Sequence, residues 1–302
     1  MTEYLELPGE QLLERLVEIW PNEAPDRIQP VYDDLRTALR IPDVPFPFRV
    51  LANWPPYLAF AVRQFSPFVR SLAFEAAAKT LRTAAARSLA ATLRSEQFAR
   101  ARAYVLREHE LLPKILLMLT AFAVGLRGRH TESAPPLGTT LPEEEPVPVR
   151  PAELPRMIDE RVPPLPDIRT LPDAVRAALE ELATVRSVPA VDDFSRALGV
   201  TDREAVVQLV QLRQAQAATV NELRATIDQL VDRLVRRFTL PGGKVLPDFM
   251  VPTDDLPVIR TAVETLQAIT REALIDVTLA RIALDGPEAS ERAPYPISQP
   301  VG

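Results

Sequence analysis

The chain has 302 residues, enough for one large domain or two of ordinary size, and 47% of them are hydrophobic, a share typical of soluble globular proteins. A formal net charge of −6 argues against nonspecific nucleic-acid binding, and the lack of cysteine excludes disulfides, a thiolate nucleophile and a cysteine-ligated metal. The first six residues carry acidic side chains where a signal peptide would be basic, so we expect a cytoplasmic protein.

Helical periodicity runs through the first half of the chain. Apolar residues recur at helical spacing over residues 32–39, and a proline-rich turn follows them. Farther on, Ser66 and Pro67 favour the start of an alanine-rich helix that continues to Leu93. The apolar run of residues 115–126 is too short to cross a bilayer, which predicts a buried core helix and no membrane association.

A proline-rich linker separates two helical halves. Residues 128–166 contain Pro-Pro pairs and a run of glutamates, a composition that cannot form a core. We therefore expect an N-terminal helical repeat over residues 1–127, this linker, and a C-terminal helical repeat over residues 167–302. The order of helix, proline-rich turn and phenylalanine occurs in both halves, and a pseudo-twofold protein of this kind would place its pocket between them.

The second half continues the helical pattern. Thr201 and Glu204 have the spacing of a capping box, and an apolar stripe then extends to Phe238. A longer stripe occupies residues 259–284 and stops at Gly286. No alternating run indicates a strand, so the predicted fold class is all-α, with two pseudo-symmetric helical repeats joined by the linker.

Residue types suited to catalysis are scarce, and two adjacent aspartates are the best candidates. The chain has two histidines, His109 and His130, and no glycine-rich phosphate loop. Asp192 and Asp193 stand at the mouth of a predicted helix, next to Phe194. Burial beside aromatic side chains would make such a carboxylate a better general base toward water. The alternative is that one of the two caps the helix, since aspartate is among the best N-cap residues, and the two roles are compatible.

Three segments of the chain resemble the group I 2-haloacid dehalogenases, all-α enzymes that hydrolyse both enantiomers of 2-haloalkanoic acids. The segments are YDDLRTALRIP at residues 32–42 with Phe46 behind it, PKILLMLTA at residues 113–121, and the tail with LDG at residues 284–286 and APYPI at residues 293–297. Together they span nearly the whole chain. The resemblance implies two helical repeats, commonly a homodimer, a small-molecule substrate, and no metal or organic cofactor.

The resemblance also implies a mechanism. In that family an aspartate acts as general base, and the water that it activates attacks the substrate Cα directly and displaces halide with inversion. The aspartate stands in an Asp-Phe pair, which matches Asp193 and Phe194 here. Phe46 matches an aromatic wall of the substrate pocket.

Four other pocket positions differ from the family. Asp43 stands in place of a tryptophan, Asp192 of a serine, Leu112 of a water-holding asparagine, and Ile115 of a tyrosine. Each ionised carboxylate about 5 Å from a substrate carboxylate would cost about 3 kcal/mol at an effective dielectric near ~20. Loss of the asparagine removes one constraint on the attacking water. We therefore expect slow, altered or absent dehalogenase activity.

Two functions remain open at this point. The first is hydrolysis of a 2-haloacid, or of a related small molecule, by water activated at Asp193. The second is binding of an apolar or cationic small molecule in the same interhelical pocket by a family member without dehalogenase activity, which the apolar Leu112 favours. Clustered aspartates can also hold a divalent cation or act as an acid and base pair, and Asp43 can equally be a solvated turn residue.

Overall fold

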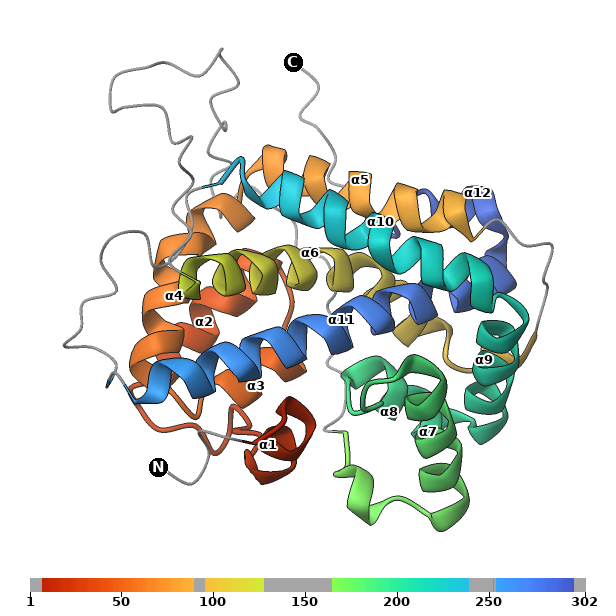
Figure 1. Ribbon diagram of the computed structural model, residues 1–302, viewed down its shortest axis with the longest axis horizontal. Helices are drawn as coiled ribbons and strands as arrows, with labels where there is room; N and C mark the ends of the chain where they lie inside the picture. Colours follow the sequence, from red (N-terminus) through yellow and green to blue (C-terminus); the bar gives the residue numbers. More distant parts are fainter. Residues whose placement is uncertain (1–6, 90–95, 128–164, 239–251, 253, 296–302) are drawn as a thin grey trace. The chain divides into compact units, whose positions relative to one another are not determined.

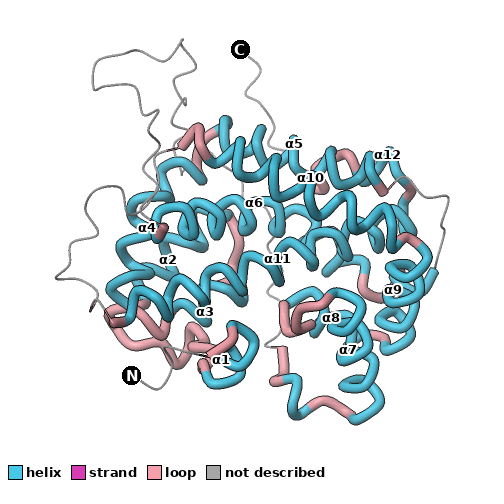
Figure 2. Tube along the Cα trace, in the orientation of Figure 1, coloured by secondary structure: helices cyan, strands magenta, loops and turns pink. Residues whose placement is uncertain are grey.

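A computed structural model describes residues 7–89, 96–127, 165–238, 252 and 254–295. All regular elements within these ranges are helices, and none is a strand (Figure 2). The predicted all-α class is therefore confirmed. The predicted linker lies outside the described residues except at its last two positions, and His130 lies outside them as well.

The helices follow the chain in the order that Figure 1 shows, from red at the N-terminus to blue at the C-terminus. They are α1 (Gly9–Arg15), α2 (Gln29–Leu39), α3 (Phe46–Leu51), α4 (Pro55–Val69), α5 (Leu72–Ser88), η2 (Glu96–Phe98), α6 (Arg102–Leu126), η4 (Ile168–Thr170), α7 (Asp173–Arg186), α8 (Asp193–Thr201), α9 (Arg203–Ala215), α10 (Ala217–Val235), α11 (Asp255–Asp285) and α12 (Pro287–Ser290). The apolar stripes predicted over residues 32–39, 115–126 and 259–284 fall within α2, α6 and α11.

Contacts along the backbone divide the chain into two compact units. Unit 1 consists of Met1–Ala77, Leu117–Asp159 and Asp232–Gln267, and unit 2 consists of Ala78–Leu116, Glu160–Val231 and Ala268–Gly302. Helices α5, α6, α10 and α11 contribute residues to both units. The repeats predicted over residues 1–127 and 167–302 are a different division of the chain, and their pseudo-symmetry stays a prediction.

Two predicted helix starts are wrong by a few residues. Pro67 lies inside α4, close to its C-terminal end, where the missing N–H removes a single helical hydrogen bond, and α5 begins at Leu72 instead. Asp202 caps α9 in place of Thr201, and its Oδ1 accepts a hydrogen bond from the backbone N–H of Glu204 at 3.0 Å. Aspartate is the stronger N-cap of the two, which explains the shift.

Helix α6 is long and apolar enough to cross a membrane by length and composition. Its most apolar window is nevertheless 94% buried inside the protein. The prediction of a buried core helix is confirmed, although the helix is longer than the apolar run that predicted it.

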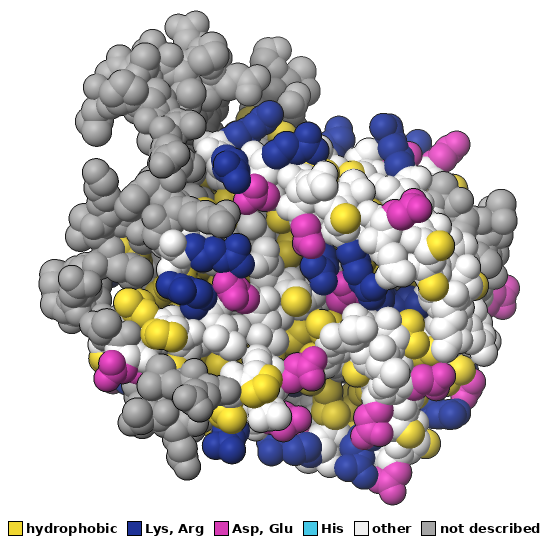
Figure 3. All heavy atoms as spheres, viewed as in Figure 1, with side chains coloured by type: hydrophobic (Ala, Val, Ile, Leu, Met, Phe, Trp, Pro, Cys, Tyr) yellow, Lys and Arg dark blue, Asp and Glu magenta, His cyan; other side chains and the backbone are white. Residues whose placement is uncertain are grey.

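Charges of both signs are mixed on the surface. On the face that Figure 3 shows, Lys and Arg side chains are interspersed with Asp and Glu among the described residues. That face has no continuous positive stripe of the kind used to bind nucleic acid.

Aromatic rings form the centre of unit 1. Phe65, on α4, is fully buried and contacts four other rings. The centroid distances are 5.8 Å to Phe68, 5.9 Å to Phe74, 6.3 Å to Phe122 and 6.0 Å to Phe238. Tilted and edge-to-face pairs at this spacing are favourable beyond the area that they bury. The rings join stretches of unit 1 that are far apart in the sequence.

We expect Phe65→Ala to lower the free energy of unfolding by about 3–5 kcal/mol, because it deletes a buried ring and leaves a cavity. Val17→Ala is the control, since Val17 is 67% exposed in the same unit, and it should change stability by less than about 0.5 kcal/mol. Urea unfolding followed by circular dichroism measures both variants. A loss below about 1 kcal/mol for Phe65→Ala would show that this cluster is not a packed core.

His109 is a buried polar side chain in the part of α6 that belongs to unit 2. Neither ring nitrogen has a hydrogen-bond partner among the described residues. Burial lowers the pKa of His109 well below its ordinary value of 6.5, and the positive charges of Arg82 and Arg281 lower it further. The imidazole is therefore neutral in the folded chain at neutral pH.

This burial predicts that acid destabilises the fold. Above pH 6.5 His109 is neutral in the folded and the unfolded chain, whereas below it the unfolded chain binds a proton that the folded chain does not. Stability should therefore fall as pH is lowered, by up to about 1.4 kcal/mol per pH unit from this residue. Urea unfolding at several pH values should show a smaller loss for His109→Gln than for wild type, with His130→Gln as the matched histidine control. An unchanged pH slope in His109→Gln would contradict the assignment.

Candidate functional site

The N-terminus of α8 is the candidate site, and Asp192 is its N-cap. Asp192 Oδ1 accepts a hydrogen bond from the backbone N–H of Ser195 at 3.0 Å, and Oδ2 accepts one from the Ser195 hydroxyl at 2.8 Å. The cap satisfies a backbone donor that has no partner within the helix. The capping role that the sequence left open between two aspartates therefore belongs to Asp192.

Asp193 is the first residue of α8 and does not act as the cap. It is 8% exposed, and its Oδ1 accepts a hydrogen bond from Arg196 Nη2 at 3.1 Å. A general base toward water is a carboxylate that can accept a proton, and Asp193 supplies a buried one beside Arg196. Cap and candidate base are thus two different residues.

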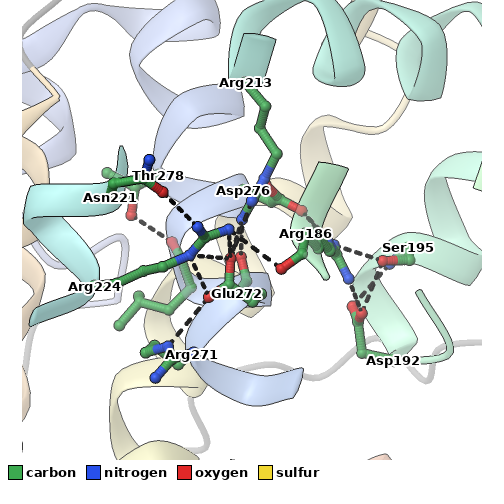
Figure 4. Close-up of polar contacts among 11 residues, drawn as sticks. Arg186, Asp192, Ser195, Arg213, Asn221, Arg224, Arg271, Glu272, Asp276 and Thr278 are labelled. Atoms are coloured by element: carbon green, nitrogen blue, oxygen red, sulfur yellow. Dashed lines mark hydrogen bonds and ion pairs between the residues drawn. The ribbon is translucent and has the colours of Figure 1, made fainter. Parts of the chain in front are cut away.

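Arg186, the last residue of α7, links the cap to the interior of unit 2 (Figure 4). Its Nη1 donates to Asp192 Oδ2 at 2.7 Å, and its Nη2 donates to Ser195 Oγ at 2.8 Å. Its Nε donates to Asp276 Oδ2 at 2.5 Å. The planar fork of a guanidinium suits this use, because its donors point in fixed directions toward three separate acceptors.

Asp276 and Glu272, one turn apart on α11, continue the network. Asp276 also accepts from Nε of Arg213, a residue of α9. Arg213 Nη1 and Nη2 both donate to Glu272 Oε2 at 3.0 Å, and Nη2 also reaches the Glu272 carbonyl at 3.1 Å. All three side chains are at most 1% exposed, so each charge depends on its partners for compensation.

The network reaches solvent through two further arginines. Arg224 on α10 donates to both carboxylate oxygens of Glu272 at 2.9 Å, and Arg271 donates to Glu272 Oε1 at 3.1 Å and to the half-exposed Asp228 at 2.7 Å. Burial opposes ionisation of Glu272, but the hydrogen bond from Arg224 and the charges of Arg213, Arg224 and Arg271 outweigh it and hold the pKa of Glu272 below its ordinary value of 4.5. Arginines from three helices thus stabilise a carboxylate in the interior.

The pairing changes an argument that the sequence suggested. Asp192 faces Arg186 and Asp193 faces Arg196. A repulsion of about 3 kcal/mol against an anionic acid applies to a carboxylate without an ion-pair partner. Each of these two carboxylates has an arginine partner. The repulsion expected from these two residues is therefore reduced, and weak binding of an acid stays a prediction. Among the described residues, no three metal-ligating side chains form a group that could hold an ion.

Three further predicted pocket residues belong to unit 2. Phe194 on α8 and Leu112 and Ile115 on α6 are all buried. Each provides an apolar side chain, as the sequence indicates. That these residues and Asp193 line one pocket stays a prediction.

The remaining two predicted residues, Asp43 and Phe46, belong to unit 1. Phe46 is buried at the start of α3, and Asp43 is half-buried in the bend that precedes it. Arg49 holds this bend: it donates to the Val44 carbonyl at 2.5 Å, and its guanidinium lies 4.0 Å from the centre of the Trp20 ring. These two contacts of Arg49 hold the backbone of the bend in place.

The sequence reasoning missed the ion network. Glu272 and Asp276 interrupt an otherwise apolar stripe on α11, at positions one turn apart next to Ala273 and Val277. Acidic side chains at that spacing on a core-facing stripe are a signal of buried pairing, because an unpaired carboxylate would be too costly there. Their arginine partners carry no comparable local signal.

Comparison with known proteins gives a match in fold. No protein-family model matches the chain, and no curated protein matches it in sequence at a significant level. A solved structure of a D-2-haloacid dehalogenase mutant matches 89% of this chain and 95% of its own, with a TM-score of 0.72 and 14% identity. A complex of a D-2-haloacid dehalogenase mutant with D-2-CPA and a complex of the dehalogenase with L-LA match with the same TM-score of 0.72 at 15% identity, over 89% of this chain and 95% and 96% of theirs. The chain therefore has the all-α fold of these dehalogenase structures.

Proposed function

We propose that this protein is a hydrolase that removes halide from small 2-haloacids, with Asp193 as the general base. The observation that carries the proposal is the fold match, at a TM-score of 0.72 over 89% of the chain, to structures of D-2-haloacid dehalogenase. The buried carboxylate of Asp193 at the start of α8 supports the role of base.

The proposed reaction is a single displacement at carbon. Asp193 accepts a proton from water while the water oxygen forms a bond to the substrate Cα. The carbon–halogen bond breaks as that bond forms, and halide leaves with the electron pair. The product is a 2-hydroxy acid of inverted configuration, and the proton taken up by Asp193 is then released to solvent.

The arginines lower the electrostatic cost of binding an anionic substrate. Arg196 and Arg186 offset the charges of Asp193 and Asp192, so the helix end is close to neutral. The N-terminus of α8 adds the positive end of the helix dipole. Phe46 is proposed as an aromatic wall for the substrate, and a homodimer, implied by the family resemblance, stays a prediction that light scattering would test.

A second function has its own support. Leu112 and Ile115 are buried and apolar, where the family resemblance implies a water-holding asparagine and a nearby tyrosine. A site without them favours binding of an apolar or cationic small molecule over hydrolysis. Halide release separates the two proposals, because a binding protein would show ligand affinity without any release.

The first test is halide release from both enantiomers of 2-chloro and 2-bromo acids. We expect slow release with inverted 2-hydroxy acid as product, and we expect Asp193→Asn to lower the rate about 100-fold or more, because an amide cannot accept the proton. Asp173→Asn is the matched control, since Asp173 is an exposed first-turn aspartate of α7. No release by wild type would reject the hydrolase proposal, and undiminished release by Asp193→Asn would move the base elsewhere.

The second test concerns the changed pocket positions. We expect the double variant Leu112→Asn with Asp43→Trp to raise the rate about tenfold or more, because it restores an amide that holds water and an aromatic wall. Rates would be compared at equal protein concentration after thermal melts show that the variant is folded. Wild type already fast on these acids would show that the substitutions do not limit the reaction, and a folded variant with no gain would favour the binding function.

A further inference from the structure

One arginine joins Asp192, the N-cap of α8, to the buried ion network. Arg186 contacts Asp192 at 2.7 Å and Ser195 at 2.8 Å on one edge, and Asp276 at 2.5 Å on the other. Figure 4 shows Arg186 between Asp276 and the pair formed by Asp192 and Ser195. Asp192 in turn caps α8 and directly precedes Asp193. A single guanidinium therefore holds the residue that sets the start of the helix.

Asp193 lies close to charges of both signs within unit 2. Arg196 on α8 pairs with Asp193 and its charge also acts on Asp167 at the cap of η4, while Asp192, next to Asp193 in the chain, pairs with Arg186 of α7, which also contacts Asp276 of α11. The hydrogen bond from Arg169 lowers the pKa of Asp167, and the charge of Arg196 contributes to that shift. Without Arg186, the carboxylate of Asp192 would stand beside the base with its charge uncompensated.

We propose that Arg186 is a positioning residue for Asp193 and acts through Asp192, an inference that rests on the proposed role of Asp193 as base. The guanidinium orients the cap from which Asp193 projects, and its charge cancels that of Asp192. The 2-haloacid dehalogenases that the sequence resembles have serine at the position of Asp192. The ion pair between Arg186 and Asp192 is therefore a feature of this chain's own residues.

Two single variants and their combination test the proposal with opposite signs. Arg186→Met leaves Asp192 uncompensated, so the acid limb of the kcat profile should move up by about one pH unit, and kcat should fall about tenfold with KM little changed. Asp192→Ser keeps a helix cap and removes the negative charge, so the acid limb should move down. The double variant removes both charges, so the limb should return close to its wild-type position.

Arg213→Met is the matched control. Arg213 is as buried as Arg186 and binds the same Asp276, but its contacts lead to Glu272 and α11. Its loss should lower thermal stability without moving the acid limb. If Arg186→Met does not fold, the downward shift in Asp192→Ser decides the proposal, because that variant keeps the pairing of Arg186 with Asp276.

Carbon NMR titration of the Asp193 carboxyl, assigned with Asp193→Asn, gives a readout that needs no turnover. If wild type releases no halide, the proposed function fails. Titration shifts of the predicted signs would still support Arg186 as the residue that positions Asp193 and tunes its titration. If halide is released but neither the acid limb nor the titration moves in Arg186→Met and Asp192→Ser, the positioning role is overturned. Arg186 would then be a structural ion-pair residue that affects stability alone.

Discussion

Two buried carboxylates, Glu272 and Asp276, impose the constraint that organises unit 2. Both are inaccessible to solvent on α11, where an unpaired charge would cost several kcal/mol. Arginines from α7, α9 and α10 compensate them, and the fixed geometry of each guanidinium restricts how those helices pack on α11. Removing one partner leaves another charge buried without compensation. Single substitutions in the network are therefore expected to be strongly destabilising.

Unit 1 meets the same need for a packed interior with different chemistry. Phe65 and the rings around it bury apolar surface without any charge to compensate, and such packing tolerates small shifts of one ring against another. Ion pairs allow less freedom, because a small displacement breaks a hydrogen bond to a charged group. Unit 1 has partly buried ion pairs of its own, such as Arg49 with Glu18, but the network around Glu272 and Asp276 lies in the unit that holds Asp193, where a catalytic group would need a defined direction.

The ion pairs of Asp192 and Asp193 change the charge expected at the candidate site. Counted alone, Asp192 and Asp193 put negative charge where an anionic acid would bind, but each faces an arginine. Leu112 and Ile115 are apolar and buried, so neither side chain can hold the water that the hydrolase proposal requires. The hydrolase proposal and the binding proposal therefore differ mainly in whether the site can position a water molecule, and less in whether it can bind an anionic acid.

Local patterns in the sequence determined the all-α class and the end of α11. The stripe over residues 259–284 marks α11, and Gly286 ends it with a φ of 88°, a conformation that favours glycine. The same patterns identified Asp192 and Asp193 at the start of α8 but could not assign their roles. Arg186 and Asp276 are 90 positions apart, and Arg213 and Glu272 are 59 apart. The cap contact of Asp192 with Ser195 and the pairing of Asp193 with Arg196 each span three positions and are local. The link from Asp192 through Arg186 to the buried network instead depends on which distant side chains the tertiary structure brings within hydrogen-bond reach, and no spacing along the chain encodes that.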